Sequence, residues 1–161
     1  MAFVDVCRIY ERHGKYLVLN PLVPSWVITN INGKACAIED DKDNVLNGDY
    51  CLKFWDSNDF YFTAAQTVTL DAGSYCFGGY FEGGDCGNDA DIFIGVTAGE
   101  DSTAEPEFKM SAKDDGWRNW QNPELSAIEV EEDGTTMTFL ISVKAKSGGW
   151  GAWDGMYLYR K

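Results

Sequence analysis

The alternation of apolar and polar residues constrains the fold of this chain most. It occurs in short stretches that are separated by turn-forming residues. In residues 135–144, one face of such a stretch would carry the apolar side chains of Met137, Phe139, Ile141 and Val143. A period of two residues is that of a β-strand with one buried face. No stretch combines a sustained period of about 3.6 residues with helix caps. Roughly ten short strands with regularly spaced turn signals predict an all-β fold, a jelly-roll β-sandwich.

The length of 161 residues predicts one domain over residues 1–161, with a core large enough to fold without disulfides. No run approaches the ~20 apolar residues of a membrane span. The amino terminus lacks a charged start followed by an apolar core, so we expect no signal peptide there. We interpret the chain as a domain of a longer secreted protein.

The net charge of −13 disfavours polyanionic partners, so nucleic acid and anionic membrane surfaces are poor candidates. A neutral ligand, or a cation such as calcium, fits the charge better because acidic loops supply the oxygen ligands that calcium prefers. Residues 39–43 are five consecutive residues of which four are acidic, and they form either a solvated loop or a calcium site. They lack the full EF-hand pattern.

The five cysteines are Cys7, Cys36, Cys51, Cys76 and Cys86. None of them forms a Cys-x-x-Cys pair, and His13 is the single histidine, so a zinc site is not expected. Cys36 with Cys51, or Cys76 with Cys86, could be bridged if their strands are neighbours. Buried free cysteines are equally common, and the sequence leaves both alternatives open.

Two local patterns predict how strands meet and which way they face. Asn32-Gly33 is the strongest short hairpin signal in the chain, and residues 3–16 could form a further edge hairpin. In the strand that ends at residue 55, Trp55 shares a face with Lys53, opposite to Phe54. We therefore expect Trp55 to lie outside the core.

Residues 116–123, Gly-Trp-Arg-Asn-Trp-Gln-Asn-Pro, are predicted to form a shaped loop, neither strand nor helix. Burying both indoles would require partners for the neighbouring guanidinium and amides, at roughly 1–3 kcal/mol for each unpaired group. At least one of Trp117 and Trp120 is therefore expected to be a contact surface. Two glycine-rich segments are also predicted as loops: residues 82–91, which are acidic, and residues 147–155, which would present Trp150 and Trp153.

The sequence lacks the catalytic motifs of most enzyme classes. There is no Gly-x-Ser-x-Gly elbow and no phosphate-binding loop, so neither acyl nor phosphoryl transfer is indicated. A β-sandwich glycoside hydrolase needs only two carboxylates, and the available ones include Glu82, Asp85, Glu129 and Glu131, although nothing marks a pair. Neutral sugar binding suits the residues better, because the apolar face of a pyranose packs on an aromatic ring. A third alternative is a structural or interaction module of a cell-surface or cellulosomal protein.

A specific resemblance adds to this interpretation. It is carried by Leu-Lys-Phe-Trp (52–55), Gln-Thr-Val-Thr-Leu-Asp-Ala-Gly-Ser-Tyr (66–75), Gly-Gly-Asp (83–85), the segment 116–123 and Gly-Gly-Trp-Gly-Ala-Trp-Asp (148–154). Over residues 20–159 the chain resembles carbohydrate-binding modules of family 61, which accompany bacterial endo-β-1,4-galactanases. The segments 116–123 and 148–154 are its most specific parts.

The resemblance implies a jelly roll with a structural calcium ion, no catalytic activity, and binding of β-1,4-linked galactose at the loops. The implied sugar-binding residues are Trp55, Glu82, Asp85, Trp117, Arg118, Asn119, Trp120 and Trp150. The implied calcium ligand is Asp154, with backbone carbonyls and either Asn20 or an acid from residues 40–49 completing the shell. The chain departs from the family pattern after Asn20-Pro21, where an acidic residue is missing, and in the segment 3–16 and the cysteines.

The expected partner is therefore a galactan-type polysaccharide of the plant cell wall. The resemblance implies that the module targets a glycoside hydrolase domain in the same polypeptide to that polysaccharide. We expect a monomer that is secreted and lies outside a bacterial cell or at its surface.

Overall fold

The structure is a computed structural model that describes residues 26–33, 36–39, 45–46 and 51–161. Within them lie the eleven strands β1 (Val27–Asn32), β2 (Cys36–Glu39), β3 (Cys51–Trp55), β4 (Phe60–Leu70), β5 (Gly73–Gly84), β6 (Asp91–Ala98), β7 (Phe108–Ser111), β8 (Gly116–Gln121), β9 (Glu124–Val130), β10 (Thr135–Ala145) and β11 (Trp150–Arg160). In this part of the chain no helix is long and apolar enough to cross a membrane.

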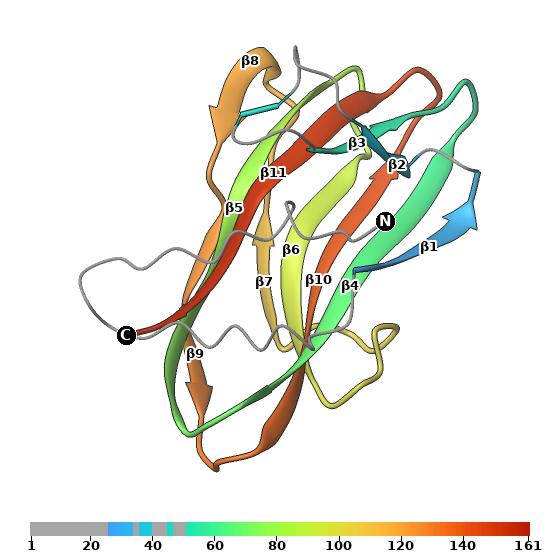
Figure 1. Cartoon of the computed structure of the whole chain (residues 1–161). Helices are drawn as coiled ribbons and strands as arrows, with labels where there is room; N and C mark the ends of the chain where they lie inside the picture. Colours follow the sequence, from blue (N-terminus) through green and yellow to red (C-terminus); the bar gives the residue numbers. More distant parts are fainter. Residues whose placement is uncertain (1–25, 34–35, 40–44, 47–50) are drawn as a thin grey trace.

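The strands pair in two antiparallel sheets, which Figure 1 shows as two layers. Sheet A has the order β1-β4-β10-β6-β7, and sheet B has the order β2-β3-β11-β5-β8, with β9 also paired to β5. The predicted jelly-roll β-sandwich is confirmed. β8 and the end of β5 lie at the upper end of the molecule in Figure 1, whereas β9 lies toward the lower end.

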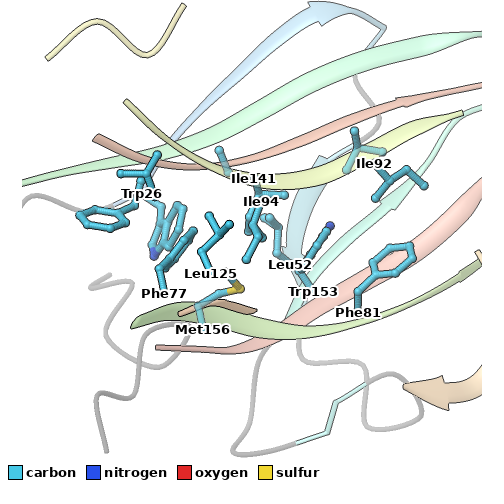
Figure 2. Packing of buried hydrophobic residues seen from close by; sticks show 14 of the residues in the cluster. Trp26, Leu52, Phe77, Phe81, Ile92, Ile94, Leu125, Ile141, Trp153 and Met156 are labelled. Atoms are coloured by element: carbon cyan, nitrogen blue, oxygen red, sulfur yellow. The ribbon is translucent and has the colours of Figure 1, made fainter. Parts of the chain in front are cut away.

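The core fills the space between the two sheets and follows the predicted alternation. The inward face of β10 buries Met137, Phe139, Ile141 and Val143, as predicted. From sheet B, the Phe81 and Trp153 rings meet with centroids 4.8 Å apart. Figure 2 shows side chains of both sheets packed into one cluster. Aromatic pairs of this kind contribute about 0.5–1.5 kcal/mol beyond the area they bury.

The hairpin predicted at Asn32-Gly33 is wrong. Gly33 does make a turn, with φ of 76°, but β1 before it pairs with β4 in sheet A, while β2 after it pairs with β3 in sheet B. The turn itself is present, but the strands on either side of it pair in different sheets, so they form no ladder with each other.

Two of the three segments predicted as loops, 116–123 and 147–155, are largely strand, whereas residues 85–90 of the predicted loop 82–91 do connect β5 to β6 outside any strand. Residues 82–84 complete β5, residues 150–155 begin β11, and residues 116–121 form β8. Trp153 is fully buried and is not presented to solvent. The glycines here make room for rings: a Cβ on Gly151 would lie 2.5 Å from the Phe54 ring. Glycine in these strands therefore marks close packing, not a chain break.

The four described cysteines, Cys36, Cys51, Cys76 and Cys86, form no disulfide with one another. β2 and β3 are neighbours, but Cys36 lies opposite Phe54, three residues along the strand from Cys51. Burial raises the pKa of Cys36 and of Cys86 to about 12, so these thiols stay protonated near neutral pH. Cys7, the hairpin predicted in residues 3–16 and the acidic residues 40–43 lie outside the described residues.

Candidate functional site

One end of sheet B carries tryptophans on the face that points away from the core. Trp55 of β3 lies opposite Trp150 of β11, which in turn lies opposite Gly84 of β5. Their neighbours Phe54 and Phe81 pack in the core, so Trp55 and Glu82 point away from it, although Glu82 is covered and only Trp55 reaches solvent. Trp55 is 57% exposed, as expected for a residue outside the core.

The Trp150 indole is held in one orientation by two neighbours at the end of β5. Its Nε1–H donates to Asp85 Oδ2 at 3.0 Å. A Cβ on Gly84 would lie 2.8 Å from Trp150 Cζ2, so the ring rests against the bare Gly84 backbone. Asp85 itself has φ of 57°, a left-handed conformation that is uncommon for a residue other than glycine. Such local strain is often found at functional sites.

The predicted loop at residues 116–123 is in fact a bulged edge strand. β8 pairs with β5 only at Phe81↔Gln121 and Gly83↔Gly116, so the four residues 117–120, which we name the β8 bulge, lie opposite Glu82 alone. Trp117 in this bulge is 56% exposed, and the Arg118 guanidinium lies 4.4 Å from the centroid of its ring. Trp120 is half-buried. One of the two indoles thus lies open to solvent, as expected.

The amides near the bulge bond mainly to the protein itself. Asn119 Nδ2 donates to Asp115 Oδ2 at 2.6 Å, and Gln121 bonds to both the amide and the carbonyl of Lys113. Asn122 Nδ2 donates to the Gly79 carbonyl at 2.8 Å. These side chains shape the edge of sheet B. The guanidinium of Arg118 and the indoles remain at the surface.

Glu82 lies beneath the bulge and is only 1% exposed. Its Oε2 accepts the Arg118 backbone N–H at 2.6 Å, while its buried Oε1 has no hydrogen-bond partner. Burial raises the pKa of this carboxyl, although the N–H and the charge of Arg118 act in the opposite direction. Sequence reasoning assigned Glu82 to an exposed loop and missed its burial, because its place in β5 depends on the pairing with β8 and β11.

The turns at this end of the sandwich are tied together. Asp59 accepts the Ser147 backbone N–H at 3.0 Å and pairs with Lys146 Nζ at 3.2 Å, joining the β3–β4 and β10–β11 turns. Beside Asp85, an open cleft of about 600 Å³ is lined by Asp85, Gly87, Asn88, Ala90, Ile92, Ala112, Lys113 and Asp114. The strand ends that carry Trp55 and Trp150 are therefore held together by these bonds, and a polar cleft lies next to them.

Asp154, the expected calcium ligand, is fully buried. Its Oδ2 accepts the Leu46 N–H at 2.7 Å and its Oδ1 accepts the Gly155 N–H at 2.6 Å. Amide donors of this kind stabilise a buried carboxylate. Among the described residues no three His, Cys, Asp or Glu side chains gather as a metal site, and Asn20 and most of residues 40–49 lie outside them. The calcium site remains a prediction.

Comparison with known proteins gives structural neighbours only. No protein-family model matches the sequence, and a search of curated proteins gives no match. The structure is similar to that of a family 61 carbohydrate-binding module in complex with β-1,4-galactotriose, with a TM-score of 0.71 and 28% identity over 84% of this chain and 88% of that one.

More distant neighbours share the fold. They include the C-terminal family 22 carbohydrate-binding module of Clostridium thermocellum Xyn10B, with a TM-score of 0.54 and 12% identity over 84% of this chain and 85% of that one. A family 22 xylan-binding domain from Paenibacillus barcinonensis Xyn10C has a TM-score of 0.52 and 11% identity over 83% and 85%. The resemblance to family 61 is confirmed, and the neighbour solved with galactotriose supports a non-catalytic sugar-binding module.

Proposed function

We propose that this chain, which has the fold of a carbohydrate-binding module, binds β-1,4-galactan or a related β-galactoside through the tryptophan-bearing end of sheet B. The observation that carries the proposal is the set of indoles on that outer face. Trp55 and Trp117 are each more than half exposed, and Trp150 is held between Asp85 and Gly84. The similarity to a family 61 module solved with β-1,4-galactotriose supports galactose as the sugar.

The chemistry of this surface suits a neutral sugar. The axial 4-hydroxyl of galactose leaves one face of the ring apolar, and an exposed indole offers a flat apolar partner for that face. Arg118 contributes a fork of N–H donors for hydroxyl oxygens, and the guanidinium lies next to the Trp117 ring that would stack. Asp85, at the rim of the neighbouring cleft, offers acceptors for sugar hydroxyls.

Three of the four carboxylates named as candidates for a glycoside hydrolase, Glu82, Asp85 and Glu129, have partners within the protein. Asp85 accepts the Trp150 N–H, and Glu82 is buried against the Arg118 backbone. Glu129 accepts the Ser74 hydroxyl in the part of sheet B where β9 pairs with β5, far along β5 from the tryptophans. The arrangement supports recognition without hydrolysis. Reducing-sugar release from galactan above a control without protein would contradict it.

The wider setting of the module is also a proposal. We propose that it belongs to a polypeptide that carries a glycoside hydrolase domain, acts outside a bacterial cell or at its surface, and directs the enzyme to plant cell-wall galactan. As an isolated module it is expected to be monomeric, which sedimentation equilibrium would check.

Calorimetric titration with galacto-oligosaccharides tests the binding function. Single-module affinity should be on the order of micromolar or weaker, where 1 μM corresponds to about −8.2 kcal/mol. Trp117→Ala and Trp55→Ala should each weaken binding by roughly thirtyfold if the indole is a hot spot, which is about 2 kcal/mol. Neither change should lower the melting temperature much, because both rings are exposed.

Met110→Ala is the matched control, because Met110 is an exposed apolar residue of β7 in sheet A, 41% accessible and outside the tryptophan face. It should bind galactan like the parent. The proposed function fails if the parent shows no binding heat at millimolar galacto-oligosaccharide. It also fails if both tryptophan variants bind as tightly as the parent.

A further inference from the structure

The β8 bulge lacks the hydrogen bonds that a regular strand would provide. Between the two points where β8 pairs with β5, four residues of β8 face the single residue Glu82. The backbone groups of a bulge need other partners, because unpaired polar groups next to a sheet are costly. The Glu82 side chain is one such partner, because its Oε2 accepts the Arg118 backbone N–H at 2.6 Å.

This bond acts at the most strained position of the bulge. Arg118 has φ of 60°, and of the described residues other than glycine only Asp85 shares a positive φ. A long side chain in this conformation carries a penalty of order 1–3 kcal/mol unless its surroundings hold it there. A charge-assisted bond from the same residue's N–H to a buried carboxylate can offset that penalty.

The conformation of Arg118 decides where the binding groups lie. With φ near 60°, the guanidinium stands 4.4 Å from the Trp117 ring centroid, so that the cation and the indole form one exposed surface. Glu82 is too deep to join that surface, since it is 1% exposed and its Oε1 is buried. A sugar hydroxyl would have to displace the bulge to reach it.

We infer that Glu82 is a positioning residue of the galactan site, which sets the Arg118–Trp117 surface through the Arg118 backbone and does not itself touch the sugar. This inference rests on the proposed function. It differs from the expectation, drawn from the family resemblance, that Glu82 reads sugar hydroxyls directly.

A double-mutant cycle on galactan affinity separates the two roles. Glu82→Ala removes the acceptor, and we expect affinity to fall about tenfold, the scale of a lost hydrogen bond to a charged group. Arg118→Ala removes the guanidinium. In the Arg118→Ala background, Glu82→Ala should cost less than about threefold, because its effect acts through Arg118. If the affinity loss of the double variant equals the product of the two single losses, the inference is wrong.

Glu82→Gln is the conservative variant, because its amide oxygen can still accept the Arg118 N–H; it should retain most of the affinity lost in Glu82→Ala. Equal losses in both variants would count against a positioning role. Glu129→Ala is the matched control, since it removes a carboxylate of sheet B that bonds to Ser74. It should leave affinity unchanged.

A readout without ligand keeps the inference separate from the proposed function. The Arg118 amide proton, bonded to a carboxylate, should resonate downfield in the parent, keep that shift in Arg118→Ala at the same position, and lose it in Glu82→Ala. If the parent binds no galactan but this pattern appears, the proposed function fails while the positioning of the bulge stands. If the shift persists in Glu82→Ala, the positioning fails whatever the parent binds.

Discussion

At the scale of single residues, the absence of a side chain at Gly84 is part of the site. The Trp150 indole occupies the volume that a Cβ on Gly84 would fill, and Asp85 holds the ring there through its Nε1–H. Gly84 therefore sets the height at which the ring lies above the sheet. A position without a side chain thus controls the orientation of Trp150, a residue of the proposed binding site.

Gly84→Ala should displace the Trp150 ring and weaken galactan binding by about tenfold, if Trp150 is a binding hot spot. Calorimetry on the variant checks the affinity. Gly78→Ala is the control, because a Cβ there would meet the Tyr157 hydroxyl farther along the same face of β5. It should lower the melting temperature and leave affinity intact. Equal affinity losses in both variants would show that the change acts on the whole sheet.

At the scale of elements, the tie between the β3–β4 and β10–β11 turns holds the strand ends that carry Trp55 and Trp150. The Ser147 N–H and the Lys146 ammonium keep the pKa of Asp59 below its usual value of 3.8. Because the folded pKa is lowered, the ionised form stabilises the fold above the unfolded value of about 3.8, and that stabilisation is lost as the pH falls through the lower folded pKa. The turns should therefore loosen in acid.

Asp59→Asn should reproduce the acid effect at neutral pH. We expect a lower melting temperature than the parent at pH 7 and a difference that shrinks as the pH falls below 4, as well as weaker galactan binding. Asp101→Asn is the control, because Thr103 likewise keeps the pKa of Asp101 low but Asp101 lies in the β6–β7 connection. That variant should show the same pH trend in stability with unchanged affinity. If the melting temperatures of Asp59→Asn and the parent differ by the same amount at every pH, this account is wrong.

At the scale of the whole molecule, a net charge of −13 makes the fold a candidate for stabilisation by a cation. We predict that calcium raises the melting temperature and that a chelator lowers it. An ion present at a hundredfold its dissociation constant adds about 2.7 kcal/mol. Asp154→Asn should abolish the response to calcium. The control is Asp133→Asn, which changes an acid in the β9–β10 turn that caps the Ala72 N–H. An unchanged melting temperature of the parent on chelation would rule the ion out.

Predictions from the sequence succeeded where a local rule was sufficient. The outward Trp55 and the buried Phe54 follow from the alternation of a strand. The cost of burying the polar neighbours predicted that at least one of Trp117 and Trp120 is exposed, and Trp117 is. The sequence also placed the candidate residues in one family pattern before any pairing was known. In the structure, Trp55, Trp150, Asp85 and the β8 bulge do gather at one end of sheet B.

Predictions failed where a residue's role depends on a distant partner. Glycines 83, 84 and 151 indicated loops, because the sequence does not show the rings that fill the space above them. Asn32-Gly33 indicated a hairpin because the turn residues do not show which strands β1 and β2 pair with. Glu82 and Arg118 are separated by 36 positions, so only the pairing of β5 with β8 brings the carboxylate to the amide.

The sequence by itself determined the class of fold, the inward faces of β3 and β10 and the residue types of the proposed sugar site, because strand alternation and side-chain chemistry are local. The tertiary structure alone decided which strands meet, that Glu82 is buried, and that Arg118 is held in a left-handed conformation beside Trp117. Those outcomes arise from contacts between segments far apart in the chain, whose free energy is gained only when both sheets have formed.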